Sequence, residues 1–413
     1  MTVTQSLPVD LALALPDRLE PASASLPSRT VVKTDLPFVA TAFRGTPPAG
    51  RDETLLLVEQ SLTFSTVRMA LDDPRIAGVV VGDQHFADHA RKMLQEGGKA
   101  LVLVKDDLPA VREGGRYQVD NDGLVDLDRL PLPVTAICSY MNDDNEALYK
   151  AWNIHDVGYF RLKFCLFQLF AEEPEAFHSE ERIEEYLTGS LAELAGRGWR
   201  RIRLVLSDPT SAELRETGIE VAAEANPELG LRGPRIAERW WPELRAIRRV
   251  LDDHPELRID VSIPFVSTIA EFQHVAAMFQ EAGLDERVGL GMTLEVPAML
   301  YELPELIETC RPAFVAVGTS DLFALLNGVD RSSDKVKVDP FSRVNRQVVD
   351  HICEIAAKHG VHFFVCGELR RNPETLRALA SSGAGELIAA ASVVEIARMN
   401  RAAAQYGDTR SAA

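Results

Sequence analysis

The stretch FFVCGELRRNP, residues 363–373, places reactive groups directly after an apolar run. Cys366 and Glu368 stand where a buried strand would end, and strand ends are where many α/β folds present side chains for chemistry. A thiol at this place can be a nucleophile, a metal ligand or a proton donor, or it can be an inert core residue, because buried cysteine is common. These residues alone leave all four roles open.

Charged and polar residues also stand where other apolar runs end. They are Arg161 and Lys163 in DVGYFRLKF, Asp208 in RIRLVLSD, Glu295 in VGLGMTLEVP, and Ser320 and Asp321 in AFVAVGTSDL. Polar groups at strand ends also occur as turn residues and helix caps. A set in which so many strand ends carry charge nevertheless favours a functional site there.

Eight apolar runs rich in β-branched residues recur between residues 131 and 405. They are VTAICSYM, DVGYFRLKF, RIRLVLSD, LRIDVSIPFV, VGLGMTLEVP, AFVAVGTSDL, HFFVCGEL and GELIAAAS. Helical patterns such as TIAEFQHVAAMFQEAG separate most of them. This rhythm predicts a (β/α)8 TIM barrel, whose chemistry sits at the C-terminal ends of the strands.

Ahead of the predicted barrel, residues 51–130 alternate strand-like and helix-like segments and predict a small α/β domain. Residues 1–50 combine many Pro, Ala, Ser and Thr residues with weak periodicity, which predicts a poorly structured lead-in. The prolines of LPLPVT indicate a connector between the domains, and residues 406–413 are expected to be a short tail.

The composition is that of an acidic globular protein. Lysine and arginine number 44 against 62 acidic residues, and the formal net charge of −18 argues against nucleic acid or an anionic membrane as a partner. A small anionic substrate would need a local arginine cluster.

Five cysteines, none in a C-x-x-C pair, disfavour a disulfide framework or structural zinc site. No apolar run reaches the ~18 residues that span a bilayer, and no leader pattern is present, so we expect a cytoplasmic protein.

Five segments in order carry a family resemblance. They are NPELGLRGPR (226–235), IPFVSTIAEF (263–272), GMTLEVPAML (291–300), GTSDLFALLNGVDR (318–331) and VCGE (365–368). Over residues 54 to 400 the chain resembles the phosphoenolpyruvate-utilising enzymes, which include phosphoenolpyruvate synthase, pyruvate phosphate dikinase and enzyme I of the sugar phosphotransferase system. The resemblance implies a phosphoenolpyruvate/pyruvate-type barrel preceded by a swivelling domain.

The resemblance also implies a metal site and a proton donor. Glu295 and Asp321 match the two carboxylates that hold Mg²⁺ in the family, and carboxylate oxygens are the hard ligands that Mg²⁺ prefers. Cys366, in the C-G-E motif with Glu368, matches the cysteine that exchanges a proton with the methylene carbon of enolpyruvate. A thiol can meet this need because its pKa lies within reach of neutrality.

The anion site is implied less completely. Arg161 and Arg331 match arginines that hold the phosphoryl group, and Arg232 matches a further substrate-binding arginine. Val205, three residues before Asp208, stands where the family has a second phosphate-binding arginine. Lys163 replaces a glutamate and Ser320 replaces an asparagine of the family pattern. Arg203 shares a strand face with Val205 but would lie deeper in the barrel than a ligand should sit.

The small domain departs from the family at its histidine. An ungapped reading places His89 at the position of the phosphohistidine that carries phosphate between sites. The family has two glycines and a hydroxyl residue just before it, which cradle the phosphate, whereas this chain reads QHFAD. Asp88 would also repel a phosphoryl group, so the pattern favours a vestigial His89 over a working carrier.

Three functional hypotheses remain open. The first is a Mg²⁺-dependent enzyme that acts on phosphoenolpyruvate, pyruvate or a related 2-oxo acid through an enolate, with phosphoryl transfer to or from a small molecule or partner as its expected reaction. The second is a catalytically silent relative that binds a metabolite or scaffolds a partner, and the third is a 2-oxo-acid carbon–carbon lyase. No nucleotide-binding domain fits in the lead-in, which argues against ATP-driven synthesis by this chain alone, and the resemblance implies a homodimer through the barrel.

Overall fold

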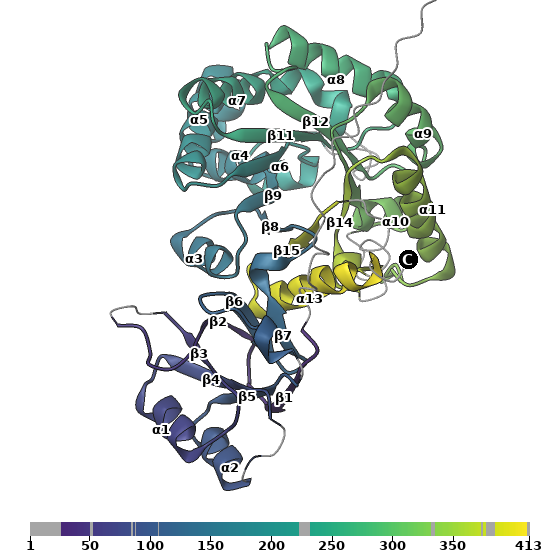
Figure 1. The fold of residues 1–413 in the computed structure, drawn as a ribbon. Coiled ribbons are helices and arrows are strands. Elements are labelled where there is room, and N and C mark those ends of the chain that lie inside the picture. The colour runs from purple at the N-terminus through teal and green to yellow at the C-terminus, as the bar shows by residue number, and fades with distance from the viewer. Residues whose placement is uncertain are drawn as a thin grey trace, which may run out of the picture.

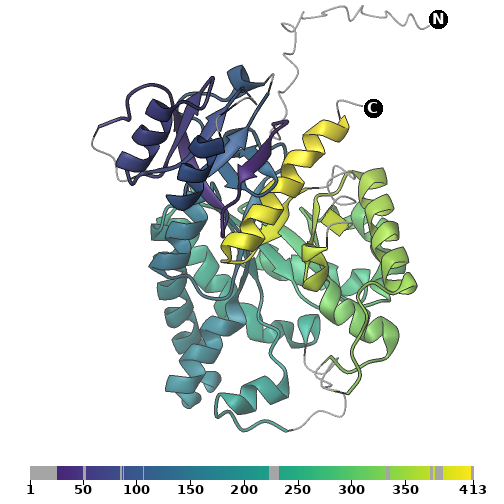
Figure 2. The same ribbon diagram turned by 90° about the horizontal axis from the view of Figure 1, so that it is seen from below.

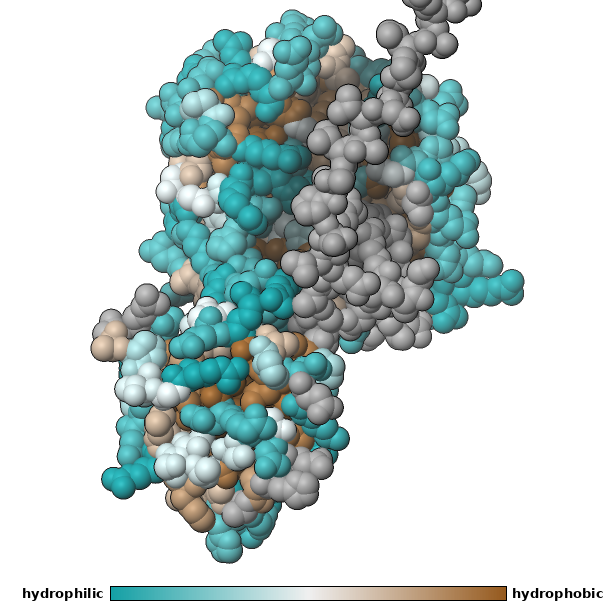
Figure 3. All heavy atoms as spheres, in the orientation of Figure 1, coloured by the Kyte–Doolittle hydropathy of each residue, from teal (hydrophilic) through white to brown (hydrophobic). Residues whose placement is uncertain are grey.

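The computed structural model describes residues 26–49, 53–83, 86, 88–105, 107–222, 232–331, 335–372, 375–376 and 385–410. Two units, each with its own sheet, follow one another along the chain (Figure 1). None of the helices in these ranges is long and apolar enough to cross a membrane. Hydrophilic residues cover most of the helix surfaces of the larger unit, and hydrophobic residues are visible in the recess between them (Figure 3).

The larger unit is the barrel that the sequence predicts. Its strands are β8 (Val134–Cys138), β9 (Asp156–Arg161), β10 (Arg201–Val205), β11 (Arg258–Ile263), β12 (Val288–Leu294), β13 (Val315–Gly318), β14 (Phe363–Cys366) and β15 (Leu387–Ala389). They form an eight-stranded parallel sheet in the order β14-β13-β12-β11-β10-β9-β8-β15, and a bridge between Phe363 and Gly385 nearly closes it. All eight predicted strands are confirmed.

Helices surround these strands (Figure 2). They are α3 (Asp143–Ala151), α4 (Leu162–Glu172), α5 (Glu180–Gly196), α6 (Ser211–Glu216), α7 (Trp241–Asp253), α8 (Ile269–Glu281), α9 (Met299–Cys310), α10 (Thr319–Asn327), α11 (Arg343–His359) and α13 (Val393–Arg410), with 3-10 turns η3 (Pro174–His178), η4 (Gly233–Trp240) and η5 (Glu368–Arg371). Side-chain caps start several of them, and Thr268, for example, accepts from Glu271 N–H at 3.2 Å. Helix α13 extends to Arg410, so the tail predicted from residue 406 is largely helical.

The barrel interior is filled rather than open. Near its N-terminal end, Arg203 is fully buried, ion-paired with Glu386 and stacked on Phe314 and Phe364 with its guanidinium carbon 4.3 and 4.4 Å from the two ring centroids. A layer containing Tyr159, Val205, Cys366 and Ile388 packs above it. Arg203 therefore points into the buried interior of the barrel, as the strand pattern predicts.

The described residues of the smaller unit form seven strands and two helices. They are β1 (Arg29–Val32), β2 (Phe38–Phe43), β3 (Leu55–Glu59), β4 (Ile76–Val81), β5 (Ala100–Leu103), β6 (Arg116–Asp120), β7 (Gly123–Asp126), α1 (Phe64–Asp72) and α2 (Asp88–Glu96), with 3-10 turns η1 (Leu108–Ala110) and η2 (Leu127–Arg129). The sheet order is β1-β5-β4-β3-β2-β6-β7. The prediction of a poorly structured lead-in is wrong for β1 and β2, because these strands pair with β5, β3 and β6, of which β5 and β6 lie far along the chain.

The smaller unit packs against helix α13, the yellow helix between the two units in Figure 2. Arg401 and Asp120 form an ion pair at 2.6 Å, and Gln118 Nε2 donates to the Ala397 carbonyl at 3.0 Å. Asn153, which precedes β9, donates to the Leu127 carbonyl at 2.7 Å. The contact therefore lies at the N-terminal ends of the barrel strands, opposite the end where a barrel site would form.

Candidate functional site

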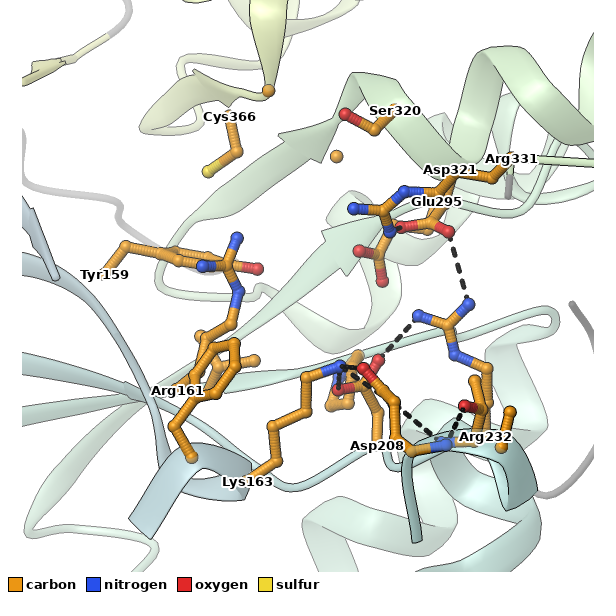
Figure 4. A pocket seen from close by; sticks show the side chains of 18 of the residues that line it. Tyr159, Arg161, Lys163, Asp208, Arg232, Glu295, Ser320, Asp321, Arg331 and Cys366 are labelled. Atoms are coloured by element: carbon orange, nitrogen blue, oxygen red, sulfur yellow. Dashed lines mark hydrogen bonds and ion pairs between the residues drawn. The ribbon is translucent and has the colours of Figure 1, made fainter. Parts of the chain in front are cut away.

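A cavity of about 530 Å³ opens at the C-terminal ends of the barrel strands (Figure 4). It brings together nine of the residues predicted from the sequence: Arg161, Lys163, Asp208, Arg232, Glu295, Ser320, Asp321, Arg331 and Cys366. They come from different strands and loops, spread over most of the barrel sequence. Parallel strands place their carboxyl ends at one edge of a sheet, which explains how such distant residues meet.

Arg161 and Lys163 mark the change from strand to helix. Arg161 is the last residue of β9, and α4 begins at Leu162 without a loop, so Lys163 lies in the first helical turn. The Arg161 guanidinium carbon lies 4.9 Å from the centroid of the Tyr159 ring. Lys163 Nζ lies 3.1 Å from Glu213 and 3.4 Å from Asp208, so two carboxylates balance its charge.

Arg232 connects two carboxylates of the site. It is buried, donates to Asp208 at 2.8 Å and to Asp321 at 3.2 Å, and stacks over Phe265 at 3.5 Å from the ring centroid. The next residue, Gly233, has φ +67°, and a Cβ there would lie 2.6 Å from the Pro264 carbonyl oxygen. Only glycine therefore allows this close approach of the Arg232 segment to the end of β11.

Glu295 and Asp321, the predicted metal ligands, are both buried. The Glu295 carboxylate accepts from the backbone N–H of Phe265 at 3.1 Å. Burial, with the charges of Asp321 and Asp208, raises the pKa of Glu295 to about 8. Burial opposes the ionisation of Asp321 as well, but the neighbouring Arg232 and Arg331, the latter donating at 2.7 Å, lower the pKa of Asp321.

This pair fits a magnesium ion. Burial, and then the charges of Asp321 and Asp208, disfavour the ionised form of Glu295, and a cation beside it would stabilise that form. Within the described ranges, no group of three or more His, Cys, Asp or Glu residues forms a metal cage. Mg²⁺ commonly uses one or two carboxylates and completes its octahedron with water and substrate oxygens, so two carboxylates suffice.

Cys366 is buried at the end of β14 and faces the cavity (Figure 4). Its carbonyl accepts from Thr319 Oγ1 at 2.7 Å, which ties β14 to the start of α10. Burial raises the pKa of the Cys366 thiol to about 12, although Arg161 counteracts part of this effect. A cysteine acts as a nucleophile or a metal ligand in its thiolate form. A thiol that stays protonated is therefore better suited to donate a proton than to fill either of those two roles.

Several residues of the site were not predicted from the sequence. Tyr159 lines the cavity two residues before Arg161, on the same strand face, and that period-2 spacing was the available signal. Glu213 lies in α6, which no strand-end pattern indicates. Gly318 is also essential to the shape, because a Cβ there would lie 2.5 Å from Glu295 Cγ.

Two predicted residues stand apart from this group. His89 is exposed in the first turn of α2 in the smaller unit and does not line the cavity. Beside it, Asp88 pairs with Arg91 at 2.7 Å and with Lys92 at 2.9 Å. Glu368 belongs to η5, but its side chain lies outside the described part of the structure.

This chain is similar in sequence to known proteins over about three quarters of its length or more. Phosphoenolpyruvate synthase of Pyrococcus furiosus is 27% identical over 326 residues, covering 75% of this chain and 39% of that protein. A protein named "Phosphoenolpyruvate-dependent phosphotransferase system" from Salmonella typhimurium is 30% identical over 391 residues, covering 81% and 50%. The chain thus spans about half, or less, of the length of these relatives. A crystal structure of pyruvate kinase from Pyrobaculum aerophilum aligns with a TM-score of 0.39 at 12% identity, covering 68% of this chain and 72% of that one.

The barrel as a whole matches a described protein family. The match runs from residue 134 to residue 406 and so includes every strand of the barrel and every charged residue of the cavity. The description of the family is "PEP-utilising enzyme, PEP-binding domain". This chain belongs to the family of phosphoenolpyruvate-utilising enzymes.

Proposed function

We propose that the barrel is a Mg²⁺-dependent enzyme that acts on phosphoenolpyruvate, pyruvate or a related 2-oxo acid through an enolate. Family membership supports a substrate of the enolpyruvate type. A Mg²⁺ ion held by Glu295 and Asp321 would supply positive charge to stabilise the enolate oxygen. Arg161, Arg232 and Arg331 would orient the anion: Arg161 would contact it, and Arg232 and Arg331, which pair with Asp321, would add positive charge nearby.

The observation that carries this proposal is the placement of Cys366 across the cavity from the carboxylate pair (Figure 4). In one direction the thiol S–H bond breaks and a C–H bond forms at the methylene carbon of the enolate, which becomes a methyl group. In the reverse direction the thiolate takes that proton back. Arg161 lowers the pKa of the otherwise strongly shifted thiol, so its positive charge would stabilise the thiolate that the transfer leaves.

Phosphoryl transfer to or from a small molecule or partner protein is the reaction we propose first, because the matched relatives include a phosphotransferase-system protein and a phosphoenolpyruvate synthase. A carbon–carbon lyase that uses the same enolate is the second candidate. It is favoured by the extensive pairing of the cationic side chains in the cavity with carboxylates, which leaves less positive charge for a phosphoryl group.

Two spectra test the proposal. Proton NMR of pyruvate in D₂O with the protein and Mg²⁺ should show loss of the methyl signal as deuterium enters. Phosphorus NMR with phosphoenolpyruvate should show whether the substrate phosphorus signal is replaced. Cys366→Ala should slow the exchange at least about a hundredfold, as expected for removal of a general acid–base group.

Cys138→Ala is the matched control. Cys138 is another buried thiol at the end of a barrel strand, its pKa is likewise raised to about 12 by burial, and it does not line the cavity. This variant should exchange pyruvate at the parental rate. If the parental protein neither exchanges pyruvate nor alters phosphoenolpyruvate, the proposed function is wrong and the silent-relative hypothesis stands.

A further inference from the structure

The charges that line the cavity are nearly balanced. Four cationic side chains line it, Arg161, Lys163, Arg232 and Arg331, together with five carboxylates, Asp208, Glu213, Glu216, Glu295 and Asp321. When all of these groups are ionised, one divalent metal ion would change the net charge of the lining from −1 to +1. A lining with a net charge of +1 can neutralise one negative charge of a ligand. Any further negative charge on the ligand would lose its water without gaining an opposite charge, which is unfavourable.

Three of the four cations already have carboxylate partners. Lys163 lies within 3.4 Å of Asp208 and 3.1 Å of Glu213. Arg331 pairs with Asp321 at 2.7 Å. Arg232 bridges two carboxylates at 2.8 and 3.2 Å. To bind a ligand directly, Lys163 and Arg232 would have to give up part of a buried ion pair, and half-exposed Arg331 would have to give up its pair with the buried Asp321.

Arg161 differs from the other three. Among the described residues it has no carboxylate partner within ion-pair distance, and its contact is the face of the Tyr159 ring. Its guanidinium extends into the cavity on the side of Cys366 (Figure 4). A planar guanidinium of this kind matches one carboxylate through two parallel hydrogen bonds.

The surface next to Arg161 is apolar. Val205 lies at the end of the neighbouring strand, where the pairing register puts it opposite Arg161. It packs in one buried cluster with Tyr159, Cys366 and Ile388. The described residues of this cluster supply no second cation beside Arg161, so a phosphoryl group carrying about 1.5 to 2 negative charges would lie largely against apolar side chains.

We infer that the site selects an unphosphorylated 2-oxo monocarboxylate over phosphoenolpyruvate, an inference that rests on the proposed function of the barrel and favours its lyase candidate over phosphoryl transfer. The carboxylate of the ligand pairs with Arg161. The 2-oxo group then points toward Glu295 and Asp321, and the methyl or methylene carbon lies beside Cys366. Val205 is the residue that sets this preference, because its uncharged side chain lies at the strand end beside Arg161, where a phosphoryl group would need a second cation.

Calorimetric titration of the full chain in Mg²⁺ with pyruvate and, separately, with phosphoenolpyruvate tests this inference. We expect pyruvate to bind at least about tenfold more tightly than phosphoenolpyruvate. Equal affinities, or tighter binding of phosphoenolpyruvate, would overturn the inference and leave the proposed function standing. Failure of both ligands to bind would overturn the inference and the proposed function together.

Val205→Arg gives a second test, with Val205→Met as its control for added bulk. The arginine should strengthen phosphoenolpyruvate binding at least about tenfold relative to the parental chain, and methionine should not strengthen it. No gain in a folded Val205→Arg protein counts against the role of Val205. If this variant does not fold, the comparison of the two ligands on the parental chain still decides the inference.

Discussion

The backbone N–H of Phe265 donates a hydrogen bond to the Glu295 carboxylate at 3.1 Å. Phe265 holds this position with φ +52°, a left-handed conformation that is uncommon for a bulky residue. Such conformations persist where the surrounding structure enforces them, and they concentrate at functional sites. The same ring supports Arg232 from below, so one strained residue orients both a predicted metal ligand and a predicted anion-binding side chain.

Mg²⁺ should stabilise the protein more as the pH rises. Metal binding requires ionised Glu295, whose pKa is about 8 without metal, so the proton competes with the ion at lower pH. The increase in Tm on adding Mg²⁺ should be larger at about pH 8.5 than at about pH 6.5. Glu295→Gln should show no Mg²⁺-dependent increase at either pH, and a normal increase in this variant would exclude Glu295 as a ligand.

The metal-free protein should lose stability as the pH rises. Glu295 has a higher pKa in the folded state than a glutamate in the unfolded chain, so its contribution is fully present below the unfolded pKa and is lost as the pH rises through about 8. Burial also raises the pKa of Glu243 to about 8, which adds a slope of the same sign. Urea unfolding from about pH 5 to pH 9 should therefore show a smaller slope in Glu295→Gln and a residual slope due to Glu243.

Arg232→Met should destabilise the barrel strongly. It removes the partner of two buried carboxylates, Asp208 and Asp321, and breaking a buried ion pair costs about 3–5 kcal/mol. Arg331→Met is the control, because Arg331 is half-exposed and, among the described residues, pairs with one carboxylate, Asp321, so the loss should be about 1 kcal/mol or less. Equal urea midpoints for the two variants would contradict this account of the site.

Gly318→Ala should damage the metal site without unfolding the barrel. An added Cβ would lie 2.5 Å from Glu295 Cγ, so the carboxylate must shift. The Tm increase with Mg²⁺ should fall by more than half, and pyruvate deuterium exchange should slow with it. Gly189→Ala in α5, where a Cβ meets nothing within 4 Å, should leave both readouts unchanged.

Asp120→Ala should loosen the smaller unit from the barrel. Asp120 accepts two hydrogen bonds from Arg401 on α13, at 3.1 and 2.6 Å, and one from Gln118 at 2.7 Å. Calorimetry should show the single parental transition split into two, because the units would no longer unfold together. Asp122→Ala, two residues away and exposed, is the control, and a split there as well would show that the ion pair is not what couples the units.

Much of the barrel could be predicted from local pattern. Eight apolar, β-branched runs separated by helical periodicity specify the strands directly, because a strand buried on both faces reads as a near-continuous apolar run. The strand-end positions of Arg161, Glu295 and Cys366 follow from the same pattern. Local pattern was insufficient for β1 and β2, since their strands are short and their stability comes from partners distant in the chain.

The sequence by itself determined which groups the site contains: a carboxylate pair, several arginines and a thiol that ends a buried strand. Only the tertiary structure decided which of these groups are charged and which cations, among the described residues, lack a carboxylate partner and can bind a ligand. Burial keeps the Cys366 thiol protonated, and pairing with carboxylates commits Lys163, Arg232 and Arg331 while Arg161 faces the cavity. The physical reason is that pKa and ion pairing depend on distances between groups from different strands, and those distances are set by barrel closure rather than by any local segment.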